Sequence, residues 1–301
     1  MAVEIGRVVT AMATPFDEAG AVDYQRACQL ASALVASGSD ALVITGTTGE
    51  SPTLTTDEKL TLYREVRAAV GSSVPLIAGS TNYNTAESVE LSREAADLGM
   101  DAILGTVPYY NKPPQAGLYR HFKVLADAVP LPIMLYNVPT RTVTNMSMET
   151  TIRLSEIDNI IGIKEASGNL DAISKIIAGS RPGFRVWSGD DPMTLPILAI
   201  GGYGVVSVAS HLVGNQIREM IQRFLRGENA DAAALHRNLL PLVNALFVTT
   251  SPIPLKYALG RVGFPVGVCR LPLVEIDPAS AAIVDTELMK IQIDLPVGAA
   301  A

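Results

Sequence analysis

The stretch IIGIKEASGNL, residues 160–170, places a lysine inside a run of branched apolar residues. Such a run is typical of a strand buried on both faces, as in a parallel sheet that is covered by helices. Because side chains alternate along a strand, we expect Lys164, Gly162 and Ile160 to point into the sheet's inner side and Ile161 and Ile163 toward the helices. An ammonium group is costly there unless it is paired, neutral or functional.

Seven more runs of this kind occur, and each is followed by apolar residues at helical spacing. The eight predicted strands are VVTAMATP (8–15), DALVITGT (40–47), PLIAGST (75–81), DAILGTVP (101–108), PIMLYNVP (132–139), IIGIKEAS (160–167), FRVWSGDD (184–191) and YGVVSVAS (203–210). Capping boxes are predicted where Thr55 precedes Glu58 and where Asn84 precedes Glu87.

This alternation predicts an α/β protein whose strands close into a (β/α)8 TIM barrel over residues 1–225. A doubly wound sheet is the alternative, but the segment TAMATPFDEAG (10–20) after the first strand contains neither G-x-G-x-x-G nor a P-loop. After the eighth predicted strand, residues 211 to about 291 are mostly helical in pattern and exceed what one closing helix needs, and we assign the excess to residues 226–301. We therefore expect a C-terminal α-helical extension that packs on the barrel or mediates assembly.

The composition argues against several function classes. The chain has 301 residues, 18% of them charged, a net charge of −7 and no basic run, so we expect neither nucleic acid nor membrane as a partner. The cysteines Cys28 and Cys269 form no C-x-x-C pair, and no leader-like segment opens the chain, which favours the cytoplasm. His121, His211 and His236 match no metal-ligand spacing, so we expect no metal and no cofactor.

Lys164 and Tyr136 stand at the carboxyl ends of neighbouring predicted strands, where barrel enzymes carry their active sites. Lys164 could reach solvent or pair with Glu165 or another acid. Alternatively, it is a Schiff-base lysine, since burial disfavours its charged form and leaves the amine free to attack a carbonyl. Gly162 would then leave room for a small ligand. Tyr136 is either a core aromatic or, beside such a lysine, a proton shuttle.

Three loops supply further candidates. In ITGTTGESPT (44–53), glycines flank Thr47 and Thr48, which indicates either an ordinary turn or a nest for a small carboxylate. VPYYNKPP (107–114) carries Tyr110, which could pack locally, enter a site or lie in an interface. Arg141 in VPTRT (138–142) is either solvated or positioned to bind a second carboxylate.

Taken together, these motifs resemble the dihydrodipicolinate synthase family of pyruvate-dependent class I aldolases. The resemblance runs from about residue 5 to residue 291. It rests on GTTGES (46–51), PYYNKP (108–113), YNVPTRT (136–142), GIKEASGNL (162–170) and SGDD (188–191), which match in order and spacing.

The resemblance implies condensation of pyruvate with L-aspartate 4-semialdehyde to 4-hydroxy-tetrahydrodipicolinate, in lysine and diaminopimelate biosynthesis. It implies that Lys164 forms the imine and that Tyr136 moves protons through Thr47 and through Tyr110 of an adjacent subunit. It further implies a homotetramer built as a dimer of dimers. For binding, it implies that Thr47 and Thr48 hold the pyruvate carboxylate and that Arg141 holds the semialdehyde carboxylate. Gly189 and Val206 would contribute backbone contacts.

Two alternatives remain open on sequence. A 2-keto-3-deoxy sugar acid or N-acetylneuraminate-type aldolase would share the lysine and the strand-five tyrosine, although Arg141 and Tyr110 favour the synthase. A catalytically idle barrel that only binds a keto acid or a partner protein is the other.

The family resemblance also bears on regulation. Lysine-inhibited bacterial members commonly carry two histidines where this chain has Thr56 and Lys59, and an asparagine where it has Tyr83. Because the ammonium group of Lys59 would repel a cationic effector, we predict weak or absent inhibition by L-lysine.

Overall fold

The structure is a computed structural model that describes residues 3–296 of the chain. Eight parallel strands pair in chain order and β8 returns to β1, so the predicted closed barrel is confirmed. Every predicted run contains its strand, but each strand ends a few residues earlier than predicted because the last residues form the loops at the barrel mouth. The strands are β1 Val8–Ala11, β2 Ala41–Ile44, β3 Leu76–Ala78, β4 Ala102–Thr106, β5 Ile133–Asn137, β6 Ile160–Glu165, β7 Arg185–Ser188 and β8 Gly204–Ser207.

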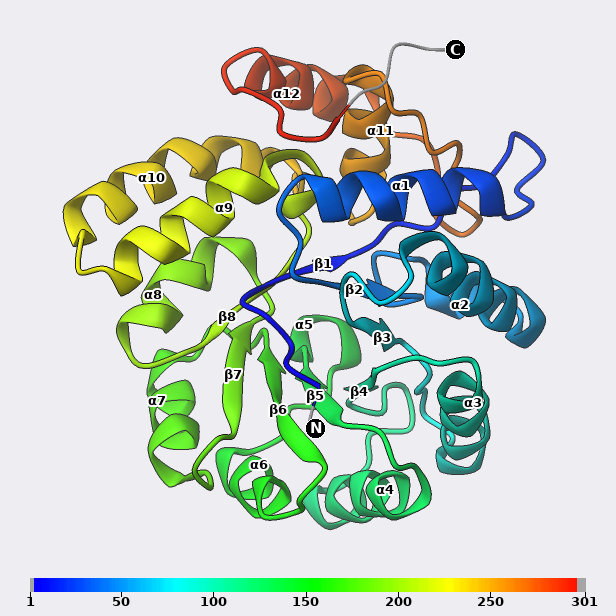
Figure 1. Cartoon of the computed structure of the whole chain (residues 1–301), viewed down its shortest axis with the longest axis vertical. Helices are drawn as coiled ribbons and strands as arrows, with labels where there is room; N and C mark the ends of the chain where they lie inside the picture. Colours follow the sequence, from blue (N-terminus) through cyan, green and yellow to red (C-terminus); the bar gives the residue numbers. More distant parts are fainter. Residues whose placement is uncertain (1–2, 297–301) are drawn as a thin grey trace.

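Helices surround the barrel on the outside, as Figure 1 shows. The principal ones are α1 Tyr24–Ala36, α2 Thr56–Val70, α3 Thr85–Asp97, α4 Gln115–Ala128, α6 Met148–Ser155, α7 Leu170–Gly179, α8 Thr194–Ala199 and α9 Ser210–Leu225. Short helical turns lie in three of the loops at the barrel mouth: η1 Ser51–Thr53, α5 Pro139–Thr142 and η2 Asp191–Met193.

The chain continues beyond α9 as a helical extension, as predicted, with α10 Asn229–Ala245, α11 Ile253–Arg261 and α12 Pro278–Leu288. In Figure 1 these helices gather at one side of the molecule, next to α9 and α1. The predicted division after residue 225 falls in the turn between α9 and α10. The division into a catalytic barrel, residues 1–225, and a C-terminal helical region, residues 226–301, stays a prediction, and residues 1–2 and 297–301 of these ranges lie outside the described residues.

Two apolar layers fill the space inside and outside the barrel. Residues such as Val43, Met134 and Trp187 fill the interior, while residues such as Leu42 and Leu135 pack against the helices. The alternation of inward and outward side chains therefore holds along most strands.

β6 departs from this alternation, and the prediction for its first two residues is wrong. Ile160 packs with the helix-facing layer and Ile161 with the interior layer, because the register between β5 and β6 shifts at this point. Beyond the shift, Gly162 pairs with Met134 and Lys164 with Tyr136, so Lys164 faces inward as predicted.

Gly162 leaves room for a side chain and not for a ligand. A β-carbon on Gly162 would lie 2.6 Å from the Trp187 indole and 2.2 Å from the carbonyl oxygen of Arg185. The Trp187 ring, fully buried and donating to the Gly6 carbonyl at 2.9 Å, thus takes the space below the lysine. The buried indole of Trp187 therefore separates Lys164, at the barrel mouth, from the rest of the barrel interior.

The capping predictions are confirmed fully at one helix and partly at the other. At α2, the Thr55 hydroxyl accepts from the Glu58 N–H, and the Glu58 carboxylate accepts from the Thr55 N–H. At α3, Asn84 accepts from the Glu87 N–H, but the Glu87 carboxylate binds the side-chain amides of Asn82 and Asn84 instead. The Asn84 N–H donates to the side-chain oxygen of Asn82, so the second hydrogen bond of a capping box, from this N–H to the Glu87 carboxylate, is not made.

Candidate active site

Lys164 lies near the carboxyl end of β6, where it is 6% exposed. Its Nζ stands 4.1 Å from the centre of the Tyr136 ring, on the neighbouring strand. The alternative that Lys164 pairs with Glu165 is wrong. The Glu165 carboxylate accepts from the Asn137 amide at 3.1 Å and from the Ser167 N–H at 2.7 Å. None of the ion pairs within residues 3–296 involves Lys164.

A cavity of about 210 Å³ opens above this lysine at the barrel mouth. It brings together six of the predicted site residues: Thr47, Thr48, Tyr136, Arg141, Lys164 and Gly189. A primary amine, a phenol, two threonine hydroxyls and a guanidinium group therefore share one small space. This set can bind a carboxylate, form an imine and move a proton.

Two predicted site residues do not line this cavity. Val206 is 1% exposed and belongs to the barrel interior, and the cavity is lined instead by Val208, two residues further along. Tyr110 lies in the loop after β4 and is 88% exposed. Its φ of 68° is uncommon for a residue with a side chain.

The loop that carries Thr47 and Thr48 is a tight turn built on β2. The Glu50 N–H donates to the Thr47 carbonyl at 3.0 Å, and Glu50 itself has a left-handed backbone with φ of 54°. On the barrel side, Gly79 lies so close that a β-carbon there would be 2.3 Å from the Thr45 carbonyl oxygen. The turn is therefore packed against β3 by a glycine that no larger residue can replace without a shift.

Two acidic groups beside the cavity, Asp190 and Asp191, have raised pKa values. Burial raises the pKa of Asp191, against the opposing hydrogen bonds from Ser207 and from the Val208 N–H and the charge of Lys164. Burial, and then the charge of Asp191, raises the pKa of Asp190, which lines the cavity.

Sequence reasoning missed the contribution of the helical extension. Phe247 and Ser251, in the segment between α10 and α11, line the cavity beside Arg141. The Arg141 guanidinium donates to the Ser251 carbonyl at 3.5 Å. No local pattern announces this contact, because it joins residues 110 positions apart.

Comparison with known proteins agrees with this geometry. The model of the dihydrodipicolinate synthetase family matches residues 4–290. The chain belongs to this family.

Named relatives of this family cover nearly the whole chain. A protein named 4-hydroxy-tetrahydrodipicolinate synthase from Dehalococcoides mccartyi is 55% identical over 294 residues, which are 98% of this chain and 99% of the relative. The crystal structure of a dihydrodipicolinate synthase from Bacillus anthracis is 45% identical with a TM-score of 0.94, over 96% of this chain and 99% of that one. The synthase from Cyanidioschyzon merolae, solved with lysine bound, is 46% identical with a TM-score of 0.94, over 95% and 98%.

The described residues contain neither a cluster of metal ligands nor a helix that could cross a membrane. Within residues 3–296, no three histidine, cysteine, aspartate or glutamate side chains gather in a way that could hold a metal ion. No helix in that range combines the length and the apolar character needed to cross a membrane.

Proposed function

We propose that this protein condenses pyruvate with L-aspartate 4-semialdehyde and so forms 4-hydroxy-tetrahydrodipicolinate, in the biosynthesis of diaminopimelate and lysine. The protein is a class I, pyruvate-dependent lyase of the dihydrodipicolinate synthetase family. One observation carries the assignment of the site: Lys164 is buried beside the Tyr136 ring, without an ion pair in the described part of the chain, in a cavity that also holds Thr47, Thr48 and Arg141.

The reaction starts at Lys164. Its amine attacks the keto carbon of pyruvate, and loss of water gives an iminium ion that acts as an electron sink. A methyl proton then leaves, and the resulting enamine carbon attacks the aldehyde carbon of the second substrate. The amino group of that substrate closes onto the former keto carbon and displaces Lys164, which restores the free amine.

Each of these steps moves a proton, and the phenol of Tyr136, whose ring centre lies 4.1 Å from the amine, can do so. Thr47 lines the same cavity and extends the relay. The third member is Tyr110 of a second copy of the chain, because the exposed Tyr110 phenol cannot serve its own site. The relay therefore requires at least a dimer.

Substrate binding uses the two anion-binding ends of the cavity. The hydroxyls and N–H groups of Thr47 and Thr48 hold the pyruvate carboxylate, and Arg141 at the rim holds the carboxylate of the semialdehyde. Backbone groups of Gly189 and Val206 complete the pyruvate side. Gly189 lines the cavity. Val206 belongs to the barrel interior, so only its backbone could contact the substrate.

Assembly and location are part of the same proposal. The family resemblance and the exposed Tyr110 support a homotetramer that is a dimer of dimers. The free thiols of Cys28 and Cys269 fit the reducing cytoplasm. Mass measurement of the native protein in solution tests the tetramer directly.

The decisive experiment has two arms. Borohydride is added with pyruvate, and the Lys164 peptide is examined for the mass of a reduced adduct. An unmodified peptide contradicts the Schiff base and favours an idle barrel. Turnover is then measured with aspartate semialdehyde against a panel of 2-keto-3-deoxy sugar acids and N-acetylneuraminate. Preference for a sugar acid contradicts the proposed substrate while leaving the imine intact.

A further inference from the structure

A buried ion pair joins the catalytic barrel to the helical extension behind the threonine loop. We define this loop as residues 45–51. The carboxylate of Glu50 lies 2.6 Å from the Nζ of Lys256 on α11, and their side chains are only 1% and 3% exposed. The other Glu50 oxygen accepts from the Arg270 N–H at 2.9 Å. Both oxygens of one loop carboxylate are thus bound by the extension.

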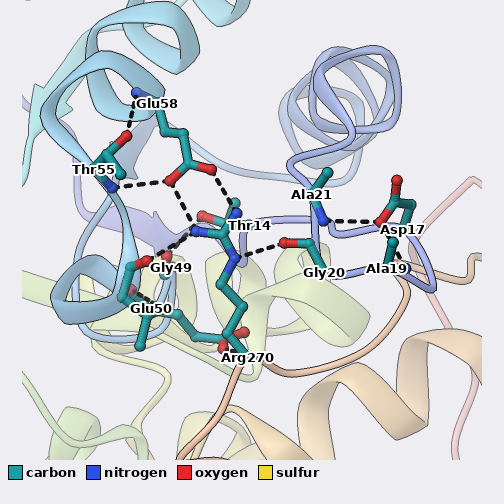
Figure 2. A network of polar contacts seen from close by, with 11 residues as sticks. Thr14, Asp17, Ala19, Gly20, Ala21, Gly49, Glu50, Thr55, Glu58 and Arg270 are labelled. Atoms are coloured by element: carbon teal, nitrogen blue, oxygen red, sulfur yellow. Dashed lines mark hydrogen bonds and ion pairs between the residues drawn. The ribbon is translucent and has the colours of Figure 1, made fainter.

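Lys256 is held in place from its own side as well. Its ammonium group donates to the Val268 carbonyl at 2.7 Å and lies 4.2 Å from the centre of the buried Phe16 ring. Figure 2 shows the second anchor, in which Arg270 reaches Glu58 on one side and the Gly20 carbonyl on the other. Arg270 donates to the Glu58 carboxylate at 2.5 and 2.8 Å and to the Thr53 carbonyl at 2.8 Å.

The points of attachment lie on both sides of Glu50, directly after the two threonines that face the cavity. Ahead of Glu50, the Gly49 carbonyl accepts from the Thr14 hydroxyl at 2.7 Å; Figure 2 draws Thr14, Gly49 and Glu50 together. Behind it, the Thr53 carbonyl is held by Arg270. Glu50 is separated from Thr48 by one residue, and its N–H closes the turn on the Thr47 carbonyl. A movement of the Glu50 side chain therefore moves the turn that carries both threonines.

We propose that Lys256 is a positioning residue, which acts through Glu50 to hold the threonine loop in its pyruvate-binding geometry. Breaking a buried pair leaves one charge without compensation, and the remaining Glu50 carboxylate must then turn toward water. The backbone of Glu50 adopts an uncommon left-handed conformation, which is strained. Once the ion pair is lost, release of this strain favours a different conformation of the loop. The helical extension thus serves the active site from behind in addition to lining it. This inference rests on the proposed function, since it assigns pyruvate to the threonines.

The test is a double-variant cycle on Lys256→Met, Glu50→Gln and their combination. Methionine keeps the length and apolar stem of lysine, and glutamine keeps the shape of glutamate, so the charge is the main change. The half-saturating pyruvate concentration should rise tenfold or more in each single variant, with a smaller change in the turnover number at saturation, because the loop binds pyruvate through both threonines and takes part in the chemistry only as a proton relay through Thr47. The double variant should be no worse than the worse single variant, since both act through one contact.

A matched control separates positioning from stability alone. Arg67→Met breaks the ion pair between Arg67 and Asp101, which lies at the opposite, amino-terminal end of the barrel. It should lower Tm and leave the half-saturating pyruvate concentration unchanged. If Lys256→Met behaves in the same way, with a lower Tm and a wild-type pyruvate response, the inference is overturned.

The inference and the proposed function fail in different ways. Borohydride trapping with pyruvate is run on the wild-type protein beside the variants. A wild-type protein that is not trapped contradicts the proposed function. A wild-type protein that is trapped, beside a folded Lys256→Met protein trapped at the same pyruvate concentrations, contradicts only the role of Lys256.

Discussion

Gly189 is the residue whose substitution most directly tests whether the lysine must stand where the structure puts it. A β-carbon added to Gly189 would lie 2.8 Å from the Ala166 β-carbon, 3.0 Å from Lys164 Cγ and 3.2 Å from Lys164 Cε. Carbon atoms pack at about 3.5–4.0 Å, so these contacts are short by roughly 0.3–1.2 Å. The Ala166 β-carbon is fixed to the backbone, and the lysine stem must therefore move.

The expected result of Gly189→Ala is a folded protein with an impaired reaction. Overpacking of this size costs about 1–3 kcal/mol of stability. Displacing the reacting nitrogen by close to 1 Å costs on the order of a hundredfold in rate. The hydrogen bond from the residue 189 N–H to the Glu165 carbonyl, 2.8 Å long, is retained by alanine, so the backbone of β7 has no other reason to change.

The assay measures the turnover number with both substrates and the rate at which pyruvate and borohydride modify the Lys164 peptide. Both should fall together. Gly179→Ala is the matched control, because its new β-carbon would lie 2.7 Å from Ile152 Cδ1 but faces α6, outside the barrel. Wild-type turnover in a folded Gly189→Ala protein, or an equal loss in Gly179→Ala, would refute the reasoning.

Four further predictions use the same protein. Lys164→Ala should abolish borohydride trapping and reduce turnover at least a thousandfold; near-normal turnover would remove the basis of the mechanism. Arg141→Gln should raise the KM for aspartate semialdehyde roughly tenfold to a hundredfold and leave the KM for pyruvate unchanged, because a charge-assisted hydrogen bond contributes about 1.5–3 kcal/mol. Burial lowers the pKa of His121 from 6.5 to about 4, so the unfolded chain binds the proton first and Tm should fall as the pH drops from 6.5 toward 4. His121→Asn, which cannot titrate, should weaken that dependence, and an unchanged pH profile would contradict it. L-lysine should inhibit weakly or not at all because Lys59 repels a cationic effector, and a submillimolar inhibition constant would overturn this.

Local sequence patterns are sufficient to predict the barrel and to predict that Lys164 faces its interior. Runs of branched residues mark strands buried on both faces, and the eight runs fix a barrel once no nucleotide-binding turn follows the first. The shift at Ile161 could not be predicted, because a single extra residue leaves the composition of the run unchanged. Lys164 was still placed correctly, since the shift occurs before Gly162 and alternation resumes beyond it.

The parts of the site that sequence analysis missed depend on long-range contacts. Phe247 and Ser251 follow a helix that looks like ordinary amphipathic surface, and only the path of the folded chain brings them to the barrel mouth. The sequence places Trp187 in a strand, but nothing in its pattern indicates that the indole fills the space at Gly162 where a small ligand is expected. Periodicity identifies which face of an element is buried, but it does not identify what the face is buried against.

The two buried lysines of this protein show how environment selects chemistry. Lys256 has a carboxylate at 2.6 Å, a carbonyl at 2.7 Å and an aromatic face, so its ammonium charge is compensated and its nitrogen is fully used. Lys164 has the aromatic face of Tyr136 but no ion pair within residues 3–296, and it borders a cavity. Burial lowers the pKa of Lys256, but the adjacent Glu50 opposes that change. Of these two lysines, only Lys164 combines a nitrogen free of a carboxylate partner with space for a carbonyl substrate.

A variant that supplied Lys164 with its own carboxylate, such as Gly189→Asp, should therefore lose activity. The new carboxylate would stabilise the charged ammonium form of Lys164 in addition to crowding its side chain. Pyruvate and borohydride should modify the Lys164 peptide more slowly in Gly189→Asp than in Gly189→Asn, which crowds the site without the charge.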